Sequence, residues 1–169
     1  HLSRDLPSEN GAIRCDISQD VVKVSVIERH GINGNIGLGF VNGFGLKWGA
    51  IGSTVGHDSH NICVVGANDD DMAQAANHLS EIGGGFVVVK EGKVLADLPL
   101  PIAGLMSDQP FELVREKLVA LRAAAKSLGT TLPEPFLQVA FLPLPVIPHL
   151  KISDLGLVDV DKFQLLGPH

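Results

Sequence analysis

Short stretches of the chain show the period-two alternation of apolar and polar residues that a half-buried β-strand gives. Residues 22–26 alternate valine with polar side chains, whereas residues 62–65 form an unbroken apolar run that is typical of a fully buried strand. Two further runs meet at Glu91-Gly92, which indicates a hairpin. The predicted strands are residues 22–26, 38–44, 50–55, 62–65, 86–90, 93–98 and 139–142, with 161–166 as a further candidate to close the sheet.

Two longer stretches have the 3.6-residue period of an amphipathic helix. The first, residues 69–82, begins with three aspartates, which suit the positive end of the helix dipole, and is followed by three glycines. The second is expected at residues 110–128 and ends at Gly129. A proline-rich run at residues 143–148 predicts an extended path. Because strands outnumber helices, the sequence predicts an α+β fold in which two main helices cover a mostly antiparallel or mixed β-sheet.

Length and composition fit one domain with a short polar extension. The chain has 169 residues, of which 45% are hydrophobic and 19% charged, enough to bury a core. Residues 1–20 are polar, and we expect an N-terminal tail or linker there, before a domain at residues 21–169. The chain begins with His1 rather than methionine, which favours a cut or processed piece of a longer protein.

Charge, apolar runs and cysteine content argue against several classes of protein. The net charge of −6 is the wrong sign for nucleic-acid binding. No apolar run approaches the ~20 residues needed to cross a bilayer, and the first ten residues have no signal-peptide core. Cys15 and Cys63 form no CxxC pair, so we expect a reduced, cytoplasmic setting without a membrane partner.

The most informative stretch lies between residues 28 and 66. Nine of the 19 glycines fall between Gly31 and Gly56, a density that favours turns and close approach of the backbone to another surface. Directly before the apolar run at residues 62–65, the chain then places five polar residues in a row. They are His57, Asp58, Ser59, His60 and Asn61, the HDSHN segment.

The HDSHN segment admits three interpretations from its residues alone. A turn held by side-chain-to-backbone hydrogen bonds is the simplest, because Asp, Ser and Asn readily make them. A metal site would need a tight turn to aim both His57 and His60 at one ion, as well as further ligands, so we expect no metal in this chain. Contact with a ligand or an active site is the third interpretation. Ser59 lies too close to its neighbours to form a nucleophilic triad with them.

Longer motifs carry a resemblance to a known family. They read HGxxG, GFGLKxGAI, TVxHDSHN and VVGxNDxDM, followed by GGGFVVV, LPLPIAGLMS and FLPLPVIPHLKISDLGLVDV. Together they span about residues 22–166, and they resemble the C-terminal region of microbial adenine deaminases of the amidohydrolase superfamily. This resemblance implies part of a hydrolase that converts adenine and water to hypoxanthine and ammonia, in purine salvage and adenine catabolism.

The resemblance also implies that the catalytic set is incomplete here. In that family the metal centre, for which manganese or iron is implied, sits on a barrel domain that precedes this region. This chain itself is therefore expected to hold no cofactor and to be inactive alone. The implied partner is that catalytic barrel, within a homo-oligomer. The resemblance also implies which residues of this chain are candidates for binding substrate or supporting the active site. They are His57, Asp58, Ser59, His60 and Asn61. The alternative is a non-catalytic structural or oligomerisation module.

Overall fold

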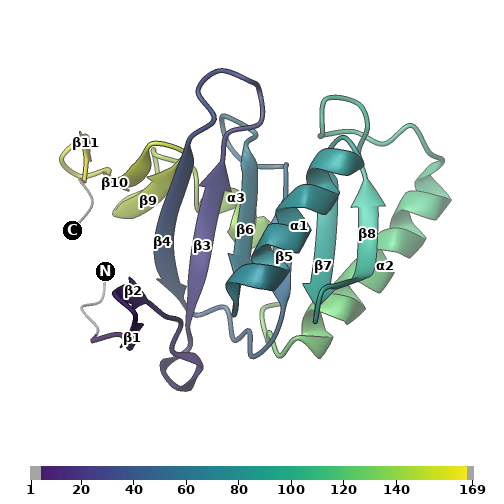
Figure 1. The fold of residues 1–169 in the computed structure, drawn as a ribbon. Helices are drawn as coiled ribbons and strands as arrows, with labels where there is room; N and C mark the ends of the chain where they lie inside the picture. The colour runs from purple at the N-terminus through teal and green to yellow at the C-terminus, as the bar shows by residue number, and fades with distance from the viewer. Residues whose placement is uncertain (1–4, 167–169) are drawn as a thin grey trace.

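Six antiparallel strands form the central sheet of the computed structural model, which describes residues 5–166 (Figure 1). The strand order is β4-β3-β6-β5-β7-β8, so the hairpins β3–β4 and β7–β8 lie at the two edges. The strands are β3 (Val21–Ile27), β4 (Ile36–Asn42), β5 (Ala50–Ser53), β6 (Ile62–Gly66), β7 (Gly85–Lys90) and β8 (Lys93–Pro99). The prediction of an α+β fold with a mostly antiparallel sheet is confirmed.

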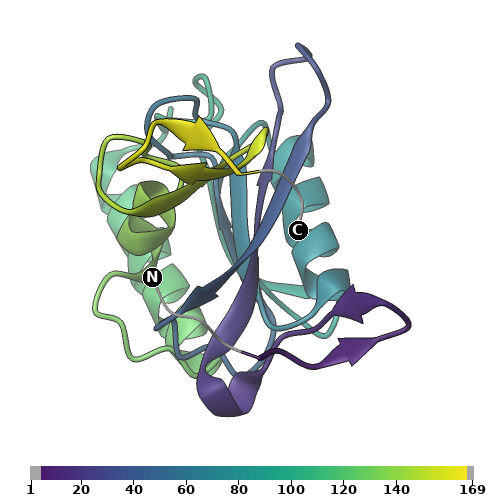
Figure 2. The ribbon, with the colours of Figure 1, turned by 90° about the vertical axis from the view of Figure 1, so that its left-hand side faces the viewer.

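Helices cover both faces of this sheet, as the edge-on view in Figure 2 shows. Helix α1 (Asp69–Glu81) packs on β5, β6 and β7 from one side. On the other side, α2 (Phe111–Ser127) packs on β7 and β8, and the short α3 (Pro135–Phe141) packs on β5 and β6. The two main helices thus lie within one residue of their predicted bounds.

Each face of the sheet has its own apolar core. On the α1 side, Met72 and Leu79 of the helix pack against Val64 and Val87. The opposite core is larger and combines β3, β6, α2 and α3. Strand β6 contributes to both, which explains its unbroken apolar run and confirms the prediction of a fully buried strand.

The segment at residues 139–142 was predicted as a strand, and this prediction is wrong. Residues 135–141 form α3, which begins with Pro135 in its first turn and buries Phe136, Val139 and Ala140 at the i, i+3, i+4 spacing. A short apolar run fits a strand and a buried helix equally well, and β-branched Val139 favoured the strand.

The C-terminal region forms a separate small sheet. Strands β9 (Leu150–Ser153), β10 (Gly156–Asp159) and β11 (Gln164–Leu165) are ordered β11-β10-β9 and antiparallel. The expectation that residues 161–166 close the main sheet is therefore wrong, because β11 pairs with β10. Strands β9 (Leu150–Ser153) and β10 (Gly156–Asp159) were not predicted.

Residues 5–20 contain regular structure that the sequence did not predict. Strands β1 (Ser8–Glu9) and β2 (Ala12–Ile13) form a two-residue hairpin, and a 3₁₀ turn, η1 (Ile17–Gln19), leads into β3. Whether residues 1–20 are a linker outside the domain stays a prediction. No helix within residues 5–166 is long and apolar enough to cross a membrane.

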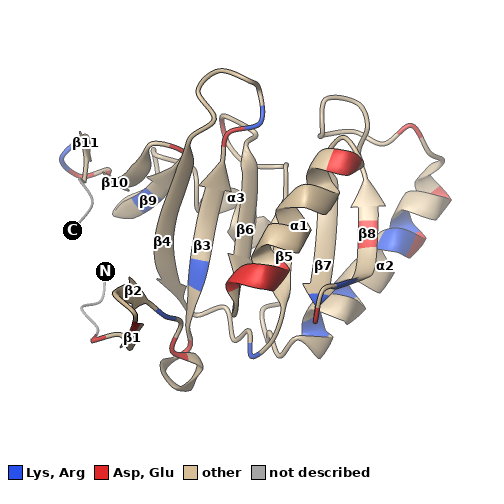
Figure 3. Cartoon of the chain, viewed as in Figure 1, with Lys and Arg blue, Asp and Glu red and all other residues tan. Residues whose placement is uncertain are grey.

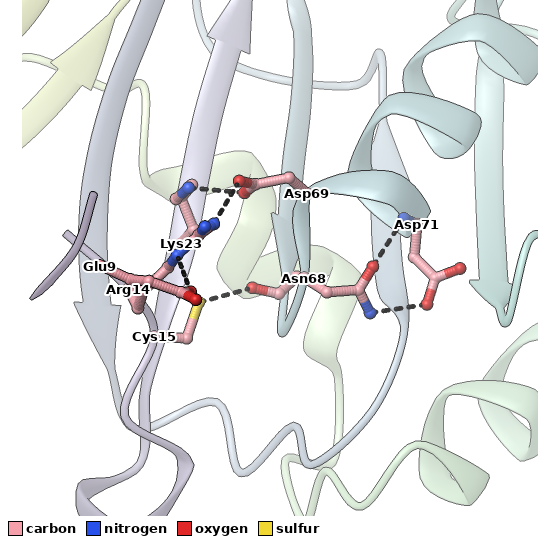
Figure 4. A network of polar contacts seen from close by, with 8 residues as sticks. Glu9, Arg14, Cys15, Lys23, Asn68, Asp69 and Asp71 are labelled. Atoms are coloured by element: carbon pink, nitrogen blue, oxygen red, sulfur yellow. Dashed lines mark hydrogen bonds and ion pairs between the residues drawn. The ribbon is translucent and has the colours of Figure 1, made fainter. Parts of the chain in front are cut away.

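Figure 4 shows how this N-terminal segment is held to the start of α1. The carboxylate of Asp69 accepts a hydrogen bond from Lys23 on β3 and pairs with Arg14 at 3.5 Å. Arg14 in turn pairs with Glu9 at 3.3 Å. The segment at residues 5–20 is therefore fastened on the α1 side of the sheet, beside β3.

Asp97 on the edge strand β8 contacts the helices of both faces. One carboxylate oxygen lies 2.9 Å from Nε2 of His78 on α1, and the other accepts from Nζ of Lys117 on α2 at 3.2 Å. Burial raises the pKa of Asp97, but the contacts with His78 and Lys117 outweigh it and hold the pKa below its ordinary value. The folded state therefore favours the carboxylate.

We expect Asp97→Asn to lower the free energy of unfolding by about 1 kcal/mol near neutral pH, because Lys117 loses its ionised partner and one of the two accepting oxygens is replaced by an amide NH₂ group. A depressed pKa stabilises the fold above the unfolded pKa, and this contribution is lost as pH falls through the folded pKa. The difference between wild type and variant should therefore shrink below about pH 4. Urea denaturation near neutral pH and at about pH 3 measures it, and a pH-independent difference would contradict this account.

Candidate functional site

Several loops far apart in the sequence meet at one end of the sheet, at the top of Figure 1. They are residues 28–35 between β3 and β4, residues 54–61 between β5 and β6, and residues 100–110 between β8 and α2. They lie together because β3, β5 and β8 run in the same direction. We call this region the loop end.

The HDSHN segment forms the turn that enters β6 at the loop end. His57, Asp58 and Ser59 are exposed, His60 is half-buried, and Asn61 is buried. The backbone N–H of His60 donates to the carbonyl of Gly56 at 2.9 Å, and His60 adopts a left-handed φ of 52°. The expected tight turn before the buried strand is therefore present.

The two imidazole rings of the turn lie near each other and are tilted by 54°. The ring centroids of His57 and His60 lie 6.2 Å apart, and the His57 ring is stacked near Phe141 of α3, at 6.5 Å and an interplanar angle of 20°. Within residues 5–166, no group of three His, Cys, Asp or Glu side chains is arranged to hold a metal ion.

Arg29 ties the HDSHN turn to two other loops. Its Nε donates to the carbonyl of His60, and its Nη2 donates to the carbonyl of Ala103 at 2.7 Å. The neighbouring His30 lies with Nε2 2.7 Å from the carbonyl of Ser59. Burial lowers the pKa of Arg29, yet a guanidinium stays protonated throughout the physiological range. Arg29 is therefore a link between loops.

Glu28 orders the loop between β3 and β4. Its carboxylate accepts from the backbone N–H groups of Ile32 at 3.1 Å, Asn33 at 3.4 Å and Gly34 at 3.2 Å, and from that of His30. Desolvation raises the pKa of Glu28, but these backbone hydrogen bonds outweigh it and hold the pKa below its ordinary value.

Asp154, in the turn between β9 and β10, joins the small sheet to the loop end. Its two oxygens accept from the side-chain amides of Asn61 at 3.3 Å and Asn33 at 3.2 Å. Its role could not be read from local spacing, because its partners lie more than ninety positions away.

Two buried polar atoms of the turn have no hydrogen-bond partner among the described residues. They are Nδ1 of His60 and the side-chain oxygen Oδ1 of Asn61. An unpaired buried polar group typically costs about 1–3 kcal/mol, so such groups in folded proteins usually have a partner. Because two adjacent residues each have such an atom, we expect a molecule or chain segment outside the described residues to form hydrogen bonds with them.

Two pockets lie elsewhere on the domain. The larger, about 350 Å³, is lined by Phe44, Phe141 and Lys151 among others. The smaller, about 220 Å³, lies between β8 and α2 next to Lys117. Neither is lined by a residue of the HDSHN turn, which projects from the loop end instead.

Comparison with known proteins shows which family the chain resembles. The family model for the adenine deaminase C-terminal domain matches residues 1–164. The chain is 67% identical over 167 residues to an adenine deaminase of Brucella abortus (strain 2308), covering 99% of this chain and 29% of that protein. It is 66% identical over 167 residues to adenine deaminase 1 of Rhizobium meliloti (strain 1021), covering 99% and 30% respectively.

The chain thus spans about 30% of the length of the curated relatives it matches. The family resemblance inferred from the sequence motifs agrees with these comparisons, which cover residues on both sides of the HDSHN turn. With nearly the whole chain matched by one family model and two-thirds of its residues identical to those relatives, the chain belongs to the family of adenine deaminase C-terminal domains.

Proposed function

We propose that this chain is the C-terminal part of an adenine deaminase, an enzyme that converts adenine and water to hypoxanthine and ammonia. The observation that carries the proposal is the 67% identity over 99% of the chain to a relative named adenine deaminase. We further propose that the full protein acts in the cytoplasm, in purine salvage and adenine catabolism, and that it forms a homo-oligomer.

The proposed partner of this domain is a catalytic barrel in the same polypeptide. The manganese or iron that the family implies does not fit the residues described here, because no three metal-binding side chains gather among them. When bound, such a metal would activate a water molecule for attack on adenine. We assign the metal to the barrel and derive no step of the reaction from this chain.

The loop end is the part of this domain that we propose to reach or brace the active site. It presents His57 and Asp58 to solvent, and the adjoining Nδ1 of His60 and Oδ1 of Asn61 have no hydrogen-bond partner within residues 5–166. Adenine carries ring-nitrogen acceptors and an amino-group donor, which complement a mixed set of donors and acceptors. Arg29, Glu28 and Asp154 hold the loops in place, as a preorganised site requires.

The alternative is a non-catalytic structural or oligomerisation module. The hydrogen bonds from Arg29 and His30 to the carbonyls of His60 and Ser59 favour it, because they would fasten the turn whether or not it meets a substrate. The two functions differ in what a change in the exposed side chains does. Only an active-site role makes turnover depend on His57, Asp58 or His60.

We expect the 169-residue chain alone to have no adenine deaminase activity, even with added Mn²⁺, Fe²⁺ or Zn²⁺, because residues 5–166 offer no set of metal ligands. The assay follows ammonia release and the loss of adenine absorbance, with the full-length protein as the positive control. Turnover at an ordinary enzymatic rate, on the order of 1–10³ s⁻¹, would show that the catalytic residues lie within this domain.

A further inference from the structure

One part of the sheet lacks a covering layer. Helix α1 packs on β5, β6 and β7, and on the same side no helix among the described residues lies in front of β3 and β4 (Figure 1). The opposite side of β4 is covered by β9 and β10. The three-layer arrangement is therefore open at one corner.

This open corner is apolar. Residues 36, 38 and 40 of β4 point to the α1 side, because Gly37 and Gly39 between them are buried against the opposite layer. The register pairs Ile27 of β3 with Ile36, so both lie on the same face. Ile36 is 58% exposed and Leu38 60% exposed. We define the β3–β4 face as Ile27, Ile36, Leu38 and Phe40.

Charge does not protect this surface. Strand β4 carries no charged residue, as Figure 3 also shows, and no proline. The basic residue of β3 on this face, Lys23, is already bonded to Asp69. Natural edge strands usually avoid unwanted pairing through charges, prolines or bulges. An edge strand without these features, with clustered aliphatic side chains, is typical of a surface that is covered in the functional protein.

We propose that the β3–β4 face is the surface on which the preceding part of the same polypeptide docks. This inference rests on the proposed function only in taking the chain as the C-terminal part of a longer protein. The relatives are about three times as long as the matched segment, and the matched family is a C-terminal domain, so the additional chain precedes it.

The path of the N-terminal segment favours this occupant over others. Arg14 and Lys23 both contact Asp69 at the start of α1, which holds residues 5–20 on the α1 side of the sheet. Figure 2 shows the β1–β2 hairpin on that side, below β4. A covalently linked partner that enters next to an apolar face has a high effective concentration there. A separate molecule would lack this advantage.

The same partner would reach the loop end. Ile32, in the loop that joins β3 to β4, is 80% exposed. Asn33 of this loop and Asn61 of the turn are both bound to Asp154. Docking on the β3–β4 face would place the preceding part of the chain beside this loop, which contacts the turn through His30.

Thiol labelling of two matched variants tests the proposal. Leu38→Cys lies on the β3–β4 face, and Val119→Cys lies on the outer side of α2; the native side chains are 60% and 58% exposed. In the 169-residue chain, both cysteines should react with a maleimide at similar rates, because thiol reactivity follows exposure. In the full-length protein, the rate for Leu38→Cys should fall by a factor of about ten or more, whereas the rate for Val119→Cys should be unchanged. Peptide mass spectrometry separates these sites from Cys15 and Cys63.

Equal reactivity of the two variants in the full-length protein would overturn the proposal. Protection of Leu38→Cys that disappears on dilution, or that arises in the isolated 169-residue chain, would assign the face to a second copy and also overturn it. Adenine turnover of the same full-length samples is read separately. An active enzyme with freely reactive Leu38→Cys overturns the docking alone, whereas a protected cysteine in a protein without turnover supports the docking and overturns the proposed activity.

Discussion

In the full-length protein, Asp58→Ala and His60→Asn should each lower adenine turnover about tenfold or more, equivalent to about 1.4 kcal/mol of transition-state stabilisation. The melting temperature should stay nearly unchanged. Both side chains belong to the HDSHN turn, which we propose reaches or braces the active site on the catalytic barrel. Asparagine is chosen for His60 because it tolerates the left-handed φ of 52° at this position.

The structure explains why stability should be spared. The Asp58 side chain is 81% exposed, and its pairing with His57 is long, at 4.0 Å. Substitutions at such exposed positions usually change the free energy of unfolding by about 0.5 kcal/mol or less. The imidazole of His60 leaves Nδ1 unpaired, while its backbone carbonyl, which accepts from Arg29, is kept in the variant.

Glu116→Ala is a suitable control for these variants. Glu116 is an exposed acid on α2, away from the loop end, and alanine suits a helix interior. It should leave turnover and melting temperature unchanged. If Asp58→Ala and His60→Asn instead melt early and keep full specific activity, the HDSHN turn is only structural and the module function is correct.

The sequence predicted elements well where one pattern dominated. Residues 69–82 combined helical spacing with three aspartates in the first turn and three glycines after the end. The structure begins this helix at Asp69 and adds a cap at Asn68, whose side chain accepts from the N–H of Asp71 at 2.8 Å. The hairpin at Glu91-Gly92 was equally clear, because two alternating runs meet there, and both residues adopt positive φ in the turn of the structure. Local signals of this kind are complete within a few residues, so they survive without tertiary information.

The loop end could be predicted only in part. The sequence located the HDSHN turn, but the side chains that fix it come from distant segments. Arg29 precedes the turn by some thirty positions, and Asp154 follows it by more than ninety. Neither residue stands in a motif with its partners. Such contacts arise from the order of the strands, which the local pattern does not contain.

Gly49→Ala should be among the most damaging single changes in the 169-residue chain. Gly49 has a φ of +66°, and an added Cβ would lie 2.2 Å from the carbonyl oxygen of Val89 and 3.0 Å from Leu128. Neither the backbone of β7 nor the buried Leu128 can move away without disturbing the core. Left-handed φ costs alanine about 1–2 kcal/mol, and overpacking adds about 1–3 kcal/mol. We therefore expect a loss of about 3 kcal/mol or more.

Gly92→Ala serves as a control that measures the cost of the left-handed φ without the steric clash. Gly92 has a similar φ of +73°, but an added Cβ there meets nothing within 4 Å. Its backbone N–H can still donate to Asp71, so only the conformational cost of about 1–2 kcal/mol remains. Urea denaturation of both variants measures the contrast. Equal losses would mean that β7 and Leu128 yield to the new methyl group, and that the junction of β5, β7 and α2 is looser than its packing indicates.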